Sequence, residues 1–278
     1  MRRPTTTKDT PMSKPVIGAQ LYSLRNHCKT LEDTVQTLAK VKAIGYTAVQ
    51  LSGIAPMNDD PDGLAQAIRE SGLNACCTHV SFEALLNDTD TMIARHQAWG
   101  VKHVATGGCP GTYGVSLAGV QAFAADIATL AQRLAPVGMD FSYHNHHWEF
   151  ARIEDGRTWL QALYETAPAD VLKAELDVHW VTAGGASPAT WIRALGPRQP
   201  LLHLKDFTVH FPEPENRWKV ERRFAPIGSG NLDWPAVLAA AEEVGVEYAL
   251  VEQDDSYGAD PFGEMEKSYN FLARMGYK

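Results

Sequence analysis

The feature that most constrains the fold is an alternation, repeated eight times from Val16 onward, between short apolar runs and amphipathic stretches with helical spacing. The apolar runs predict strands at 16–22, 48–53, 74–80, 103–109, 140–146, 172–180, 200–207 and 248–254. Helices are predicted between them, for example at 30–44, 117–135 and 234–244, and a glycine follows several of them. Eight strand-then-helix units in about 250 residues are the expected content of a closed (β/α)8 TIM barrel, an α/β fold with one domain.

An open, doubly wound sheet is the main alternative fold. It would usually carry a glycine-rich phosphate loop after its first strand, whereas here Gln20-Leu21-Tyr22-Ser23 occupies that place. Residues 1–15 are expected to form a flexible N-terminal leader, and residues 16–278 the catalytic barrel. The longest stretch without a clear pattern, 208–233, is expected to be an irregular loop at the catalytic face.

Composition restricts the possible partners. The formal net charge is −8 and the Lys and Arg residues are scattered, which argues against binding to nucleic acid. The N-terminus lacks the pattern of a signal peptide and no apolar run is long enough to span a bilayer, so we expect no membrane partner. The four cysteines show no zinc-finger spacing, and a cytoplasmic location is expected.

Polar clusters end the last four predicted strands, at 143–146, 175–179, 202–206 and 251–254. Because side chains alternate across a strand, residues two apart point to the same side. Apolar neighbours pack outward under the helices, which leaves one set of side chains facing the barrel interior: Glu175, Asp177, His179, His203, Lys205 and Glu252. On the fifth strand, His144 and His146 share one face.

One residue from each of these strands gives a candidate metal site made of His144, Asp177, His203 and Glu252. Two imidazoles and two carboxylates favour Mn²⁺, Co²⁺, Fe²⁺ or Zn²⁺ over Ca²⁺. Such a set leaves open positions for a substrate that chelates through two oxygens. His146 and Glu149 are alternatives to His144 as the ligand from the fifth strand.

Five segments resemble the sugar phosphate isomerase/epimerase family, the xylose isomerase-like TIM barrels that also include the endonuclease IV branch. They are 18–25 (GAQLYSLR), 143–150 (YHNHHWEF), 176–180 (LDVHW), 202–206 (LHLKD) and 251–254 (VEQD). The resemblance implies a divalent metal, most commonly Mn²⁺ with Mg²⁺, Co²⁺, Fe²⁺ or Zn²⁺ as alternatives, held by strands five to eight. It also implies a possible homo-oligomer.

The resemblance assigns the last three ligand positions to Asp177, His203 and Glu252. The first position departs from the family pattern, because His144 stands where many epimerases have a glutamate. In a ketose 3-epimerase, two glutamates act as paired acid and base on opposite faces of the sugar carbon. The imidazole of His144 therefore calls the two-carboxylate mechanism into question.

Candidate roles follow from the expected chemistry. A metal that chelates a carbonyl and the neighbouring hydroxyl acidifies the C–H bond between them. Glu252 is then expected to be the base, a histidine to return the proton and Lys205 to stabilise the developing oxyanion. The histidine candidates are His144, His146 and His179. Candidate substrate contacts are Gln20, His79, Glu175, His179 and Trp180. Glu175 has a second interpretation as a salt-bridge partner of Lys205 or Lys173.

The expected activity is that of a metal-dependent isomerase or epimerase acting on a small sugar or keto sugar through an enediolate. If a leaving group lies β to the acidified carbon, the enediolate expels it. A lyase or hydratase acting on 3-keto-glycosides by β-elimination is therefore the alternative. Two further classes are a DNA endonuclease, which the charge of −8 argues against, and a binding module without chemistry, which the retained ligand set argues against.

Overall fold

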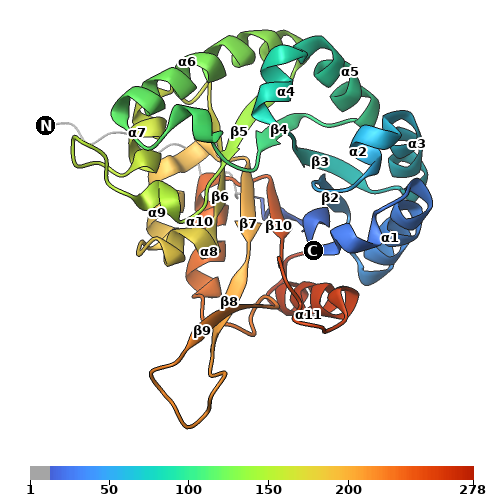
Figure 1. Cartoon of the computed structure of the whole chain (residues 1–278). Coiled ribbons are helices and arrows are strands. Elements are labelled where there is room, and N and C mark those ends of the chain that lie inside the picture. The colour runs from blue at the N-terminus through green and yellow to red at the C-terminus, as the bar shows by residue number, and fades with distance from the viewer. Residues whose placement is uncertain (1–12) are drawn as a thin grey trace, which may run out of the picture.

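The computed structural model describes residues 13–278, and within them eight parallel strands close into a barrel surrounded by helices (Figure 1). The predicted TIM barrel is therefore confirmed. Neighbouring strands follow the order β1, β10, β7, β6, β5, β4, β3 and β2 around the barrel. Their bounds are β1 (Val16–Gln20), β2 (Ala48–Leu51), β3 (Asn74–His79), β4 (His103–Thr106), β5 (Asp140–His144), β6 (Lys173–Asp177), β7 (Leu201–Leu204) and β10 (Tyr248–Val251).

Helices form the outer layer of the molecule (Figure 1). The α-helices are α1 (Leu31–Ile44), α2 (Pro56–Asp59), α3 (Pro61–Ser71), α4 (Phe82–Asn87), α5 (Thr89–Trp99), α6 (Leu117–Leu134), α7 (Trp159–Thr166), α8 (Val178–Ala183), α9 (Pro188–Leu195), α10 (Trp234–Val244) and α11 (Pro261–Arg274). Short 3-10 helices are η1 (Leu21–His27), η2 (Gly111–Tyr113), η3 (Ala135–Val137), η4 (Trp148–Phe150) and η5 (Gly196–Arg198). None of the helices in the described residues has both the length and the apolar character needed to cross a bilayer.

Local sequence signals set the helix ends. The side chain of Thr30 accepts a hydrogen bond from the Asp33 N–H at 3.1 Å and so caps the start of α1. Gly45 ends the same helix with a φ of 124°, a conformation that residues with a Cβ atom rarely adopt. These two signals explain why the predicted helix at 30–44 agrees with α1 to within one residue.

Alternation along the strands divides the barrel into layers. Leu202 and Leu204 of β7 pack outward in the main hydrophobic core. Leu201 and Leu250 belong instead to a second cluster, completed by Ala48, Cys76, Cys77 and Ala105. This cluster lies in the barrel interior, and the candidate site residues lie towards the carboxyl ends of the strands, the end where barrel enzymes place their active sites.

The prediction that residues 208–233 form an irregular loop is wrong. β8 (Asp206–His210) and β9 (Glu221–Ala225) pair as an antiparallel hairpin, which Figure 1 shows projecting from the barrel. The predicted seventh strand at 200–207 therefore ends at Leu204, and its last residues begin the hairpin. The hairpin strands are mostly half-buried or exposed, so they lack the apolar alternation that marks the barrel strands.

The predicted sixth strand at 172–180 is too long, because β6 ends at Asp177. The Asp177 side chain accepts a hydrogen bond from the Trp180 N–H at 3.1 Å and caps α8. His179 and Trp180 consequently lie on a helix, and the prediction that His179 points inward from a strand is wrong. Residues 1–12 of the predicted leader lie outside the described residues.

Candidate metal centre

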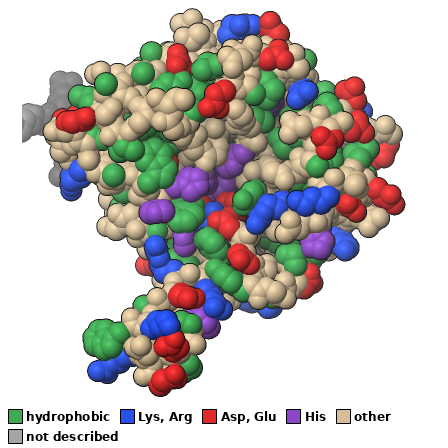
Figure 2. Space-filling model, viewed as in Figure 1, with side chains coloured by type: hydrophobic (Ala, Val, Ile, Leu, Met, Phe, Trp, Pro, Cys, Tyr) green, Lys and Arg blue, Asp and Glu red, His purple; other side chains and the backbone are tan. Residues whose placement is uncertain are grey.

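A cavity of about 350 Å³ opens at the carboxyl ends of the barrel strands. Figure 2 shows histidine side chains gathered in a hollow at the centre of this face. The residues that line the cavity are Tyr22, Ser52, His79, Gly107, His144, His146, Lys205, Glu252 and Asp254. These residues come from both halves of the chain. Together they form a small polar cavity that is large enough for a sugar.

The four predicted ligands lie together beside this cavity. His144, Asp177, His203 and Glu252 are buried, and each offers one donor atom within 4.8 Å of the others. His203 Nδ1 is 2.7 Å from Glu252 Oε2, and His144 Nε2 is 4.0 Å from Asp177 Oδ2. The four side chains come from the ends of β5, β6 and β7 and from the residue after β10, which are adjacent strands in the barrel.

Two of these ligands have buried donor atoms that form no hydrogen bond in the described part of the chain, although Lys205 Nζ lies 3.2 Å from Asp177 Oδ2. Asp177 Oδ2 and His144 Nδ1 are buried and form no hydrogen bond within residues 13–278. Burial and the neighbouring His203 and His79 hold the pKa of His144 well below its ordinary value, so its imidazole is neutral and keeps a lone pair. Metal ions bind deprotonated imidazole and carboxylate groups, so His144 and Asp177 suit a divalent cation, whereas His203, whose pKa its carboxylate neighbours raise, would release a proton when the metal binds.

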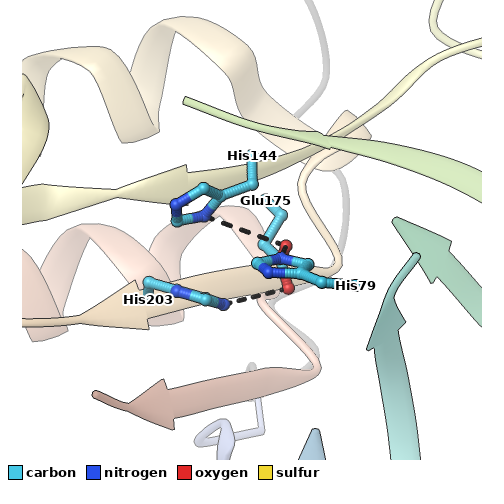
Figure 3. Close-up of side chains that lie close together, drawn as sticks. All are labelled: His79, His144, Glu175 and His203. Atoms are coloured by element: carbon cyan, nitrogen blue, oxygen red, sulfur yellow. Dashed lines mark hydrogen bonds and ion pairs between the residues drawn. The ribbon is translucent and has the colours of Figure 1, made fainter. Parts of the chain in front are cut away.

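Glu175 belongs to a second group of possible ligands, with His79, His144 and His203 (Figure 3). Its oxygens already have partners, however. Gln50 Nε2 donates to Oε1 at 2.8 Å, and His79 Nε2 is 2.5 Å from Oε2. Both Glu175 oxygens are thus engaged, whereas the contacts of Glu252 with His203 and Lys205 are made by Oε2. The group with Asp177 and Glu252 is therefore the better candidate for a metal site.

Glu175 instead fixes the orientation of His203. His203 Nε2 lies 3.1 Å from Glu175 Oε1 and 2.7 Å from Gln50 Oε1, which directs Nδ1 towards Glu252. Burial alone would raise the pKa of Glu175, but His203 and His79 lower it to about 2. Burial alone would lower the pKa of His203, but Glu175 and Glu252 raise it to about 10. A carboxylate behind a histidine ligand orients the ring and increases its basicity.

Glu175 does not form the predicted ion pair with Lys205 or Lys173 in the described residues. Lys205 pairs with three other carboxylates, and its Nζ lies 3.2 Å from Asp177 Oδ2, 3.0 Å from Glu252 Oε2 and 3.1 Å from Asp254 Oδ2. Burial alone would lower the pKa of Lys205, but these carboxylates raise it above its ordinary value. The buried ammonium supplies positive charge beside the candidate ligands.

His146 and Glu149 lie close to His144, but neither belongs to a group of candidate ligands within residues 13–278. His146 lines the cavity, and burial together with Lys205 lowers its pKa to about 4. Glu149 is fully buried and accepts hydrogen bonds from the Tyr143 hydroxyl and the His146 N–H, both at 2.8 Å. Glu149 therefore holds the loop that carries His146.

Gln20, His179 and Trp180 do not line this cavity, although the Trp180 ring lies 5.4 Å from the ring of His146, which does. Gln20 is fully buried, and its Oε1 accepts a hydrogen bond from the Tyr22 N–H at 3.0 Å. His179 and Trp180 pack against Phe224 of the hairpin, with ring centroids 5.0 and 6.2 Å apart. Of the predicted substrate contacts, His79 does line the cavity.

Sequence reasoning missed Tyr22, Ser52 and Gly107, which also line the cavity. Each follows a barrel strand, at the end where the site lies. Their position is thus the only signal that they carry, because none has a side chain typical of a metal ligand.

Residues 38–275 match the family described as xylose isomerase-like TIM barrel. The chain belongs to this family. Among solved structures, a sugar phosphate isomerase/epimerase from Parabacteroides distasonis ATCC 8503 is similar with a TM-score of 0.76 and 20% identity, covering 95% of each chain. No curated protein was found to match the chain.

Two other solved structures with the same fold have different descriptions. The probable 3-DHS dehydratase involved in petrobactin synthesis from Bacillus anthracis has a TM-score of 0.67 and 16% identity, with 93% of this chain and 98% of that chain covered. A xylose isomerase-like TIM barrel protein from Mycobacterium smegmatis in complex with magnesium has a TM-score of 0.69 and 12% identity, with 94% and 96% covered. At these identities the similarity establishes the shared barrel fold.

Proposed function

We propose that this protein is a divalent-metal-dependent isomerase or epimerase that removes a proton beside the carbonyl of a sugar. The observation that carries the proposal is the buried set of His144, Asp177, His203 and Glu252, whose donor atoms lie within 4.8 Å of one another. The set borders a cavity of about 350 Å³, which suits a monosaccharide. The similar isomerase/epimerase and the magnesium-bound barrel support the same class.

A divalent cation at these four residues, Mn²⁺ in our proposal, supplies Lewis-acid stabilisation of the negative charge that develops on an enediolate. Glu252 lies on the cavity wall and is the proposed base. His144 and His146 line the same cavity from β5 and the loop after it, and they are the proposed groups that return the proton. Since β5 and β10 are separated by two strands in the barrel, the two groups approach a bound sugar from different sides.

Lys205 has a role in charge stabilisation. Its side chain is 2% exposed, so water screens its charge weakly. Because Lys205 also lines the cavity, it is placed to stabilise an oxyanion on the substrate. The surrounding carboxylates keep it protonated, since they raise its pKa.

The test is exchange of solvent deuterium into a panel of ketoses and 3-keto-glucose, followed by NMR with the Mn²⁺-loaded protein. We expect exchange at one carbon beside the carbonyl, and its loss in Glu252→Gln. Lys102→Met is the control, because Lys102 lies at the opposite end of the barrel, just before β4. Absence of exchange from the metal-loaded wild type across the panel would refute the proposal.

The second candidate is a lyase or hydratase acting on 3-keto-glycosides. The observation that favours it is the imidazole of His144 in the ligand set, in place of a second glutamate that would act as acid and base. The similarity to a probable dehydratase points the same way. In the same NMR experiment, release of a leaving group identifies the lyase, whereas exchange without cleavage identifies the isomerase.

A further inference from the structure

A second cavity, of about 480 Å³, lies next to the catalytic cavity. His79 lines both. Ser52 lines the catalytic cavity and the next residue, Gly53, lines the second one. A Cβ atom at Gly53 would lie 2.7 Å from the ring of Tyr22, which also lines the catalytic cavity. His79 and the contact between Tyr22 and Gly53 therefore mark a shared boundary between the two cavities.

The walls of the second cavity combine apolar side chains with positive charge. Ile54, Met57, Met92 and Trp99 are buried apolar residues that line it. Lys29, which precedes α1, and Arg95, on α5, line it too. No Asp or Glu of the described residues lines this cavity, so its charged side chains are all cations. Cations beside an apolar wall favour a ligand that is apolar in part and carries an anionic group.

The catalytic cavity differs in its charges, because its lysine is paired with carboxylates. Glu252 and Asp254 line it, and Lys205 is engaged by ion pairs with both. Lys29 and Arg95 form no ion pair within residues 13–278, so their charges are available to an anionic group of a substrate in the second cavity. The charge distribution gives a substrate with two unlike ends a single preferred orientation.

We propose that the second cavity binds a substituent of the substrate that is apolar and ends in an oxyanion, a carboxylate or a phosphate, while the sugar occupies the catalytic cavity. The inference rests on the proposed function for the identity of the sugar end. It extends that function, because it requires a substrate larger than a free monosaccharide. Under the lyase alternative, the second cavity holds the leaving group.

Unreactive glycosides test the inference separately from catalysis, because a sugar without a keto group cannot be enolised. The probes are the phenyl, 4-carboxyphenyl and 4-phosphophenyl β-D-glucosides, with affinity for the Mn²⁺-loaded protein measured by calorimetry. We expect the carboxylated or the phosphorylated glucoside to bind about fivefold more tightly than the phenyl glucoside, the gain that two partly exposed ion pairs provide. Added salt should reduce this preference and leave the binding of the phenyl glucoside unchanged.

The double variant Lys29→Met/Arg95→Met should lose the preference for the anionic glucosides and keep the affinity for the phenyl glucoside. Lys102→Met removes a positive charge at the other end of the barrel and should keep the preference. Equal affinity of the wild type for all three glucosides, or a preference that survives in the double variant, would overturn the inference. If anionic glucosides bind selectively but no ketose exchanges deuterium, the second cavity stands and the proposed function fails.

Discussion

Glu175 is the residue on which the geometry of the candidate metal centre depends most. It contacts His203 on the metal side and His79 on the cavity side, and it is fully buried (Figure 3). Gln50 links the two side chains, since it forms hydrogen bonds with both Glu175 and His203. The orientation of a proposed ligand is therefore set by residues that do not bind the metal themselves.

Glu175→Gln should weaken metal binding although all four proposed ligands remain. The neutral amide orients His203 less well and no longer increases its basicity, and loss of such a partner typically costs 10–100-fold in metal affinity. Calorimetric titration with Mn²⁺ measures the change. Glu165→Gln, an exposed position that pairs with Arg157, is the matched control. An unchanged Mn²⁺ affinity in Glu175→Gln would show that Glu175 has no orienting role.

The pKa of Glu149 predicts a dependence of stability on pH. Burial raises the pKa from 4.5 to about 7, in spite of hydrogen bonds from Tyr143 and His146 that lower it. The folded state therefore binds this proton more tightly than the unfolded state, and the free energy of unfolding falls as pH rises from about 4.5 to about 7, by roughly 3 kcal/mol.

Glu149→Gln removes the titrating group. The difference in unfolding free energy between about pH 5 and pH 8 should shrink by roughly 2–3 kcal/mol relative to the wild type, as urea unfolding at a series of pH values would measure. Glu154→Gln, at a nearby exposed position, is expected to leave the difference unchanged. If Glu149→Gln retains the full pH dependence of the wild type, Glu149 is ionised in the folded state throughout this range.

At the residue scale, alternation along the strands predicted which side chains point inward, because it depends only on neighbours in the chain. It placed Glu175, His203 and Lys205 in the barrel interior, where the structure has them. No local sequence pattern identified the residues that contact Glu175. Gln50 and His79 belong to β2 and β3, about a hundred residues earlier in the chain, and their proximity depends on closure of the barrel.

At the scale of elements, two predicted boundaries were wrong because the local sequence signals were weak. The predicted sixth strand ended too late because Asp177 starts α8, and a single capping residue inside an apolar run is a weak signal. The hairpin of β8 and β9 was missed because its exposed strands lack an apolar face. By contrast, α10 has the predicted bounds, since Pro and Asp mark its start and Gly its end.

Asp206 anchors the segment that follows the hairpin. The residue is fully buried and its carboxylate accepts hydrogen bonds from the N–H groups of Gly228 and Gly230, both at 3.0 Å, and from Trp234 Nε1 at 2.7 Å. Asp206→Ala should lower the unfolding free energy by about 2–4 kcal/mol, because these buried donors lose a charged partner. Urea unfolding measures the loss, with Asp206→Asn as a milder variant.

Glu221→Ala is the control for Asp206, since Glu221 is exposed at the outer end of β9. It should change the unfolding free energy by less than about 0.5 kcal/mol. Equal stability of Asp206→Ala and Glu221→Ala would contradict the anchoring role.

At the scale of the whole molecule, the barrel was predictable because each strand-helix unit is local and eight units close in a regular order. The cavities were not predictable in the same way. They depend on loops from several units, such as the segments that carry Ser52, Gly107 and Glu252. The family assignment agrees with the predicted barrel and leaves the substrate to be determined.

Metal binding should stabilise the entire barrel, because the ligands come from strands that meet only in the folded state. A metal concentration of 100 times Kd adds about 2.7 kcal/mol to the unfolding free energy, which corresponds to an increase in Tm of roughly 5–10 °C. Differential scanning fluorimetry with Mn²⁺ and with a chelator measures the shift. Asp177→Asn should abolish it and Asp170→Asn, an exposed position, should retain it. A wild-type Tm that is insensitive to both additions would contradict a metal site in the barrel.

The most direct test of the central claim is anomalous X-ray diffraction from a crystal of the protein soaked in MnCl₂. The account predicts one strong manganese peak within about 2.0–2.6 Å of donor atoms from His144, Asp177, His203 and Glu252. A peak held by His79 and Glu175 instead, or no peak at the carboxyl ends of the strands, would contradict the assignment of the metal centre.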